Sequence, residues 1–271
     1  MSQGTPSRAD LTGCREKLAR AKEKLDSLKF DTTSYIAGRP YEVTNEIAGD
    51  TSRLRFTLKQ PLRRSWGVDA GEIATGVRSA LDYLVYQLAI DSGANPRTGR
   101  TQFPIFLSDE DYRKGGRKSH RERMLAGVAQ RHRRQIDKLQ PFHRGVQAAV
   151  NDPLTVLRAV SDHEKHKDLH VTVAVMQTLT LRMAHPGGTA YYRMHFAEAE
   201  PLNDGQVIFE MPLSEVPPPP PGTEFGIEGT GRTPDFDIGY VGDRLVTAEG
   251  LDRIVLHVSG IVDFFERRIS T

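Results

Sequence analysis

The chain has 271 residues, of which 38% are hydrophobic, so it contains enough apolar material for one large domain or two small ones. The formal net charge is only +2, and the overall charge therefore singles out no class of partner. The single cysteine, Cys14, excludes a disulfide framework. The first ten residues contain no apolar signal segment, and no apolar run approaches the ~20 residues of a membrane span. We therefore expect a cytoplasmic protein without a membrane partner.

The first predicted helix covers residues 6–29. Its apolar side chains recur at alternating intervals of three and four residues, which is the spacing of a heptad repeat. They are Leu11, Cys14, Leu18, Ala21, Leu25 and Leu28. The stripe is shorter than three heptads and includes Ala and Cys, so it predicts a bundle helix or a dimer contact rather than a free coiled coil. Residues 41–47 and 53–58 then alternate apolar and polar side chains across Gly49-Asp50, which predicts a β-hairpin.

The most strongly apolar helix is predicted over residues 68–92. Its predicted buried face comprises Ile73, Val77, Leu81, Leu84, Val85 and Leu88. Three polar residues, Arg78, Ser79 and Asp82, interrupt this helix. Arg78 and Asp82 are four residues apart, so one interpretation is an intrahelical ion pair. The other is a polar pocket shared with residues 151–170, in which both side chains face that stretch rather than water.

A basic segment follows, defined here as residues 113–134, with nine Lys or Arg residues and one acid, Glu122. One interpretation is a solvated face, and the alternative is a surface that binds phosphates. The candidate nucleic-acid-binding residues are Arg117, Lys118, Arg121, Arg131, Arg133 and Arg134.

Residues 151–170 concentrate more proton-transfer and anion-binding groups than any other stretch. Asp152 and Pro153 predict a helix start, because aspartate caps free amides and proline is tolerated at the first helical position. Leu154, Leu157 and Val160 share one side of this helix at about 100° per residue. The polar groups are Arg158, Asp162, His163, Lys165, His166 and His170.

Three hypotheses account for this polar cluster. The cations can simply complement the C-terminal end of the helix dipole. His166 and His170 have the i, i+4 spacing of a metal pair, although neighbouring lysines repel a cation. The cluster can also be an acid–base and anion site, in which an imidazole transfers protons while Arg158 and Lys165 stabilise charge on a phosphate.

The C-terminal part of the chain predicts short antiparallel strands over residues 179–183, 190–196, 206–210 and 225–228, separated by Gly and Pro. Residues 171–176 fit either the end of the preceding helix or a further strand. The five prolines at 217–221 predict a stiff spacer. A final amphipathic helix is predicted from about Thr247, with Leu251, Ile254, Val255, Val258, Ile261, Val262 and Phe265 facing the core. His257 lies beside this stripe and is expected to be structural.

Four motifs together resemble a family of uncharacterised bacterial proteins. They are SWGVDAGEIATGVRSALDYLVYQL at residues 65–88, TQFPIF at 101–106, LQPF at 139–142 and DHEKHK at 162–167. More distantly, paired helices with a polar motif in the later one resemble the HEPN superfamily, many of whose members are metal-independent ribonucleases. The Arg-x4–6-His motif of that superfamily acts across a dimer. Arg158 and His163 have this spacing, with Ala159 at the position where asparagine is common.

These patterns predict an α+β protein with a helical, bundle-like core, an added antiparallel sheet and a C-terminal amphipathic helix. We expect residues 1–170 to form the helical unit with an inserted hairpin, and residues 171–271 to supply the sheet and the final helix.

The resemblance implies an RNA-binding or metal-independent RNA-cleaving protein, in stress or phage defence, with RNA or a nucleotide as partner, a homodimeric state and no cofactor. Arg158, His163 and His166 would be catalytic, supported by Arg78, Ser79, Asp82, Asp162 and Lys165. The RNA 2′-hydroxyl would be the nucleophile. The alternatives are a non-catalytic ligand-binding or scaffold protein, and an enzyme that uses the histidines and Asp82 on a small molecule or with a metal.

Overall fold

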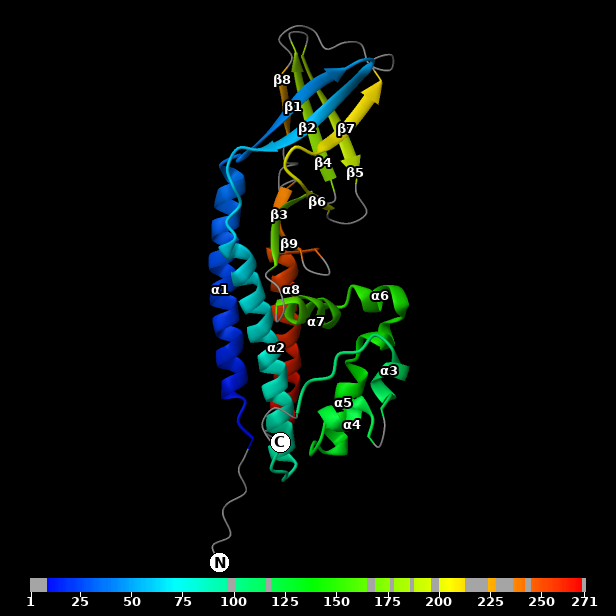
Figure 1. Ribbon diagram of the computed structural model, residues 1–271. Helices are drawn as coiled ribbons and strands as arrows, with labels where there is room; N and C mark the ends of the chain where they lie inside the picture. The colour runs from blue at the N-terminus through cyan, green and yellow to red at the C-terminus, as the bar shows by residue number, and fades with distance from the viewer. Residues whose placement is uncertain are drawn as a thin grey trace, which may run out of the picture.

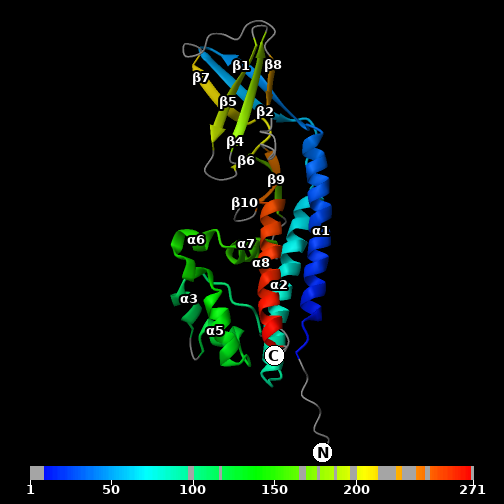
Figure 2. The same ribbon diagram turned by 180° about the vertical axis from the view of Figure 1, so that it is seen from behind.

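The computed structural model describes residues 9–96, 101–115, 118–164, 169–175, 178–185, 188–195, 200–212, 224–227, 236–241 and 245–269. Three long helices, α1 (Thr12–Ala37), α2 (Ser65–Asp91) and α8 (Ala248–Ile269), lie side by side, and strands gather beyond one end of them (Figures 1 and 2). The described part of the chain is therefore α+β, as the patterns predict. No described helix combines the length and the apolar composition needed to cross a membrane.

Amphipathic periodicity accounts for the three-helix core. All six residues of the heptad stripe are buried, five of them within α1 and Leu11 at its N-cap, and the helix continues to Ala37 instead of ending near residue 29. All seven apolar residues of the predicted stripe in α8 are buried as well. The stripe of α1 packs on α2 and α8 of the same chain, so the bundle-helix interpretation is confirmed, while the homodimer stays a prediction.

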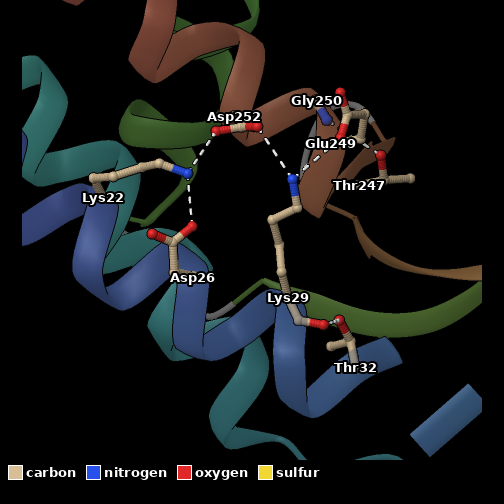
Figure 3. Close-up of polar contacts among 8 residues, drawn as sticks. All are labelled: Lys22, Asp26, Lys29, Thr32, Thr247, Glu249, Gly250 and Asp252. Carbon is tan, nitrogen blue, oxygen red and sulfur yellow. Dashed lines mark hydrogen bonds and ion pairs between the residues drawn. The ribbon is translucent and has the colours of Figure 1, made fainter. Parts of the chain in front are cut away.

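Ion pairs join the outer edges of α1 and α8. The Asp252 carboxylate on α8 accepts from Lys22 Nζ at 3.2 Å and from Lys29 Nζ at 3.1 Å (Figure 3). Lys22 also bonds to Asp26 one turn further along α1, at 2.6 Å. Burial opposes ionisation of Asp252, but the bonds from Lys29 and Lys22 lower the pKa of its carboxyl overall. These contacts connect two turns of α1 to one residue of α8.

The Trp-Gly pair at the start of α2 has a packing role. Trp66 is buried with its ring edge-on to Tyr35 at 5.2 Å. A Cβ on Gly67 would overlap the carbonyl oxygen of Leu169, the residue just before the strand that begins at His170. Glycine is therefore required here by close backbone approach.

The predicted hairpin forms from β1 (Tyr41–Ala48) and β2 (Thr51–Leu58), with Gly49 at a φ of 59° in the turn. Strand β2 also pairs antiparallel with β7 (Val207–Pro212). This sheet thus combines strands from both sides of the predicted boundary at residue 170.

Two further antiparallel sheets occur among the described residues. One has the order β10 (Leu245–Thr247), β9 (Phe236–Val241), β3 (His170–Val175) and β6 (Glu200–Leu202). The other has the order β5 (Gly188–His195), β4 (Thr178–His185) and β8 (Glu224–Ile227). The four predicted strands are present as β4, β5, β7 and β8, but they belong to two sheets. Residues 171–175 form a strand, and the polyproline stretch lies outside the described residues.

A side unit of short helices flanks the bundle (Figure 1). It consists of α3 (Asp109–Arg113), α4 (His120–Met124), α5 (Gln130–Lys138), η1 (Pro141–Arg144) and α6 (Val146–Val150). Helix α7 (Pro153–Glu164) connects this unit to α2 and α8. The predicted start of α7 is confirmed, since Asp152 Oδ1 accepts from the Leu154 amide at 2.8 Å.

Candidate functional site

The polar residues of α2 bind the backbone of an extended segment, residues 103–106 (Phe-Pro-Ile-Phe). Asp82 Oδ1 accepts from the Phe103 amide at 2.8 Å, and Arg78 Nη2 donates to the Phe103 carbonyl at 2.7 Å. Arg78 and Asp82 also approach each other to 3.4 Å. Their side chains are 14% and 31% exposed, so both turn away from open water and form the intrahelical ion pair as well. Ser79 is half-buried beside them.

Two more side chains form hydrogen bonds with the backbone of the 103–106 segment. Gln140, which is 1% exposed, donates to the Pro104 carbonyl at 2.9 Å and accepts from the Phe106 amide at 3.2 Å. Arg158 on α7 donates from Nη1 to the Ile105 carbonyl at 2.8 Å.

The segment is covered by protein yet does not pair with a strand, so its backbone groups need side-chain partners. Hydrogen bonds to this segment therefore connect RSALD (residues 78–82), FPIF (103–106) and LQPF (139–142) with one another and with Arg158.

A pocket of about 610 Å³ opens between this segment, α3, α4 and α7. Its loop side is formed by Ile105, Phe106 and Leu107, with Asp111 from α3 and His120 from α4. Its α7 side is formed by Thr155, Arg158, Ala159 and Asp162, which share one face of the helix. The pocket has the volume typical of a site for one small organic ligand. Of the basic segment, His120 lines this pocket opposite the residues of α7.

Donors and acceptors lie close together in the pocket. The Arg158 guanidinium lies over the Phe106 ring at 5.5 Å, and its Nε is 3.5 Å from Asp162 Oδ2. Both side chains are about half exposed, at 48% and 51%. Asp111 Oδ2 accepts from the Ser108 hydroxyl at 2.9 Å. The site therefore presents one guanidinium beside two carboxylates.

His120 contacts a guanidinium at the edge of the pocket. Its Nδ1 lies 2.9 Å from Arg123 Nη2. The formal charges of the carboxylates and the guanidinium that line the pocket, Asp111, Asp162 and Arg158, sum to −1.

The other predicted catalytic residues lie outside this pocket or outside the described residues. His163 is half-buried on α7 and is not one of the nine residues that line the pocket. It follows Arg158 by five residues, which places it about 140° around the helix. His166 and Lys165 lie outside the described residues. His170 belongs to β3 and not to α7.

The basic segment is partly structural. Arg121 forms a bidentate pair with Asp137, donating from Nε at 2.7 Å and from Nη2 at 2.6 Å. The Tyr112 hydroxyl donates to the same carboxylate at 2.8 Å. Burial opposes ionisation of Asp137, but these hydrogen bonds lower the pKa of its carboxyl overall. Burial, together with the neighbouring Asp137, raises the pKa of Tyr112. Arg121 therefore helps to form the small core of the side unit.

The remaining candidates of the basic segment differ in exposure. Arg133 donates to the Val128 carbonyl at 2.7 Å, and Arg131 pairs with Asp91 at 2.7 Å. Lys118 and Arg134 are exposed. Arg117 lies outside the described residues. Only part of the predicted phosphate-binding surface is thus presented to solvent.

Sequence reasoning missed His120, Asp111 and Gln140. A local signal for His120 existed in the Ser119–Glu122 pattern, which forms a capping box at the start of α4. It marks His120 as the first helical residue but does not indicate which element it faces.

Among the described residues, no group of three or more His, Cys, Asp and Glu side chains is placed to hold a metal ion. No protein-family model, no curated protein and no solved structure matches the chain.

Proposed function

We propose that this protein binds single-stranded RNA or a nucleotide at the pocket between α4 and α7. The observation that carries the proposal is that Arg158 and Asp162 of α7 line one pocket together with His120, which lies within the basic segment. The exposed Lys118 and Arg123 flank His120, and such cations attract the phosphates of a nucleic acid. The pocket adds apolar surface from Phe106 and Leu107 together with hydrogen-bonding groups, as recognition of unpaired bases requires.

Cleavage stays a separate prediction. Arg158 would have to stabilise the phosphorane while His163 or His166 transfers protons. Arg158 lines the pocket, whereas His163 does not and lies about 140° away from it around α7. Binding without chemistry is therefore the function that the geometry supports best.

Fluorescence anisotropy with a labelled single-stranded RNA 12-mer at three salt concentrations tests the proposal. The double variant Lys118→Glu/Arg123→Glu is expected to weaken binding at least tenfold. Its salt slope should decrease by about 1.4, since each phosphate contact to a single strand contributes about 0.7. The matched control is Lys17→Glu/Arg20→Glu, which makes the same charge change at exposed positions of α1.

Arg121 and Arg133 are left intact because their replacement would disturb the side unit itself. Equal weakening by both double variants would show that only net charge matters. Absence of binding by the wild-type protein would favour the scaffold alternative.

A further inference from the structure

The charge of the pocket argues against a phosphate inside it. Two carboxylates, those of Asp111 and Asp162, accompany a single guanidinium, that of Arg158, in the lining of the pocket. A phosphate in this space would meet a formal charge of its own sign. A ligand that presents both N–H donors and oxygen or nitrogen acceptors meets a partner for each group. This inference rests on the proposed function and concerns which part of the RNA or nucleotide enters the pocket.

The arrangement of the Arg158–Asp162 pair narrows the ligand further. A carboxylate binds two adjacent N–H donors through its two oxygens, and a guanidinium donates to adjacent acceptors. Guanine has two adjacent donor groups, N1–H and the N2 amino group, next to the acceptors O6 and N7. On the Watson–Crick edge, adenine and cytosine each offer only one donor group, and uracil has its single N–H between two carbonyls. Guanine is thus the base whose hydrogen-bonding groups match an arginine beside an aspartate.

A ligand can reach both Arg158 and Asp162, because each side chain is about half exposed. Arg158 uses Nη1 for the Ile105 carbonyl, and its other N–H groups include those of Nη2. A carboxylate has about four acceptor positions, so Asp162 can accept from a base while it stays near Arg158. The half-exposed Leu107 supplies apolar surface for one face of the base. Outside the pocket, Lys118 and Arg123 remain for the phosphate.

From this geometry we infer that the pocket selects an unpaired guanine, with Asp162 binding the N1–H and N2 amino groups and Arg158 donating to O6 and N7. Isothermal titration calorimetry with GMP, IMP, AMP, CMP and UMP measures the preference directly. GMP is expected to bind about 5- to 150-fold more tightly than AMP, the range of one good two-pronged base contact. IMP, which lacks the N2 amino group, should lie between them.

The variant Asp162→Asn should bring the affinities for GMP and AMP to within about threefold of each other, since one of its two acceptors becomes a donor. Asp109→Asn is the matched control, because Asp109 is an exposed carboxylate on α3 that pairs with Arg113 and does not line the pocket. It should preserve the full preference for GMP.

The outcomes separate this inference from the proposed function. Equal affinity for all five nucleotides would overturn guanine selection while leaving RNA binding in place. A preference for GMP that survives Asp162→Asn would overturn the role of Asp162. RNA binding without any nucleotide binding would place the base outside the pocket, and loss of both would remove the proposed function as well.

Discussion

Gln140 offers the sharpest test of how the pocket is built. Its buried side chain donates to the Pro104 carbonyl and accepts from the Phe106 amide, and it contacts the Ile136 carbonyl at 3.2 Å. Gln140→Met preserves an unbranched side chain of similar size, so the cavity contribution should be small. The change leaves the Pro104 carbonyl and the Phe106 amide without this partner. At about 1–3 kcal/mol for each of these two groups, we expect a loss of about 2–6 kcal/mol.

Urea unfolding of wild type, Gln140→Met and the control Gln147→Met measures this loss. Gln147 is exposed on α6, so its replacement should change the free energy of unfolding by less than about 0.5 kcal/mol. Hydrogen exchange adds a local measurement, since the amides of Phe103 and Phe106 should exchange faster in Gln140→Met than in wild type. Affinity for RNA should fall in parallel, because Ile105 and Phe106 form one wall of the pocket.

Equal stability of Gln140→Met and Gln147→Met would refute the reasoning. It would mean that the apolar contacts of the segment suffice to place it. Unchanged exchange at Phe103 and Phe106 would lead to the same conclusion even if the global stability changed.

Three other predictions test the packing, the chemistry and the pH response. Gly67→Ala should lower the free energy of unfolding by about 1–3 kcal/mol, because its Cβ would overlap the Leu169 carbonyl. In Gly76→Ala, on the same helix, the new Cβ would meet only Ala21 at 3.8 Å, an ordinary van der Waals distance. This control should raise the free energy of unfolding by up to about 1 kcal/mol, as measured by thermal or urea unfolding. If the chain cleaves RNA as the resemblance implies, activity on single-stranded RNA should survive EDTA and fall about 10²–10⁴-fold in His163→Ala, and a gel assay in which EDTA removes the activity would contradict that mechanism. Burial lowers the pKa of His257; Asp152 has a smaller opposing effect, and Arg144 lowers the pKa slightly further. The unfolded chain therefore binds a proton more readily than the folded chain, and the free energy of unfolding should decrease as pH falls below about 6.5. The decrease in the free energy of unfolding between pH 7.5 and 5.5 should be smaller in His257→Gln, and an unchanged decrease would show that other groups cause it.

The sequence alone determined the elements whose signals are local. The stripe of α8 has a wide apolar face repeating near 3.6 residues, and every residue of it is buried. The start of α7 follows from Asp152 and Pro153, which act within one helical turn. The β1–β2 hairpin follows from alternation on both sides of a two-residue turn. In each case the residues that decide the structure are close together in the chain.

Tertiary structure decided the partners of these elements and the use of the polar side chains. Periodicity indicates that β2 is a strand, but its pairing with β7 joins segments that are about 150 residues apart. Arg78, Asp82 and Arg158 are conspicuous in the sequence because they are charged on largely apolar helices. Their partners are backbone groups of the 103–106 segment, and any residue type can supply a backbone carbonyl or amide. His120 and Arg158 line the same pocket although they are 38 residues apart in the chain, and the local spacing of charged residues does not encode that long-range arrangement.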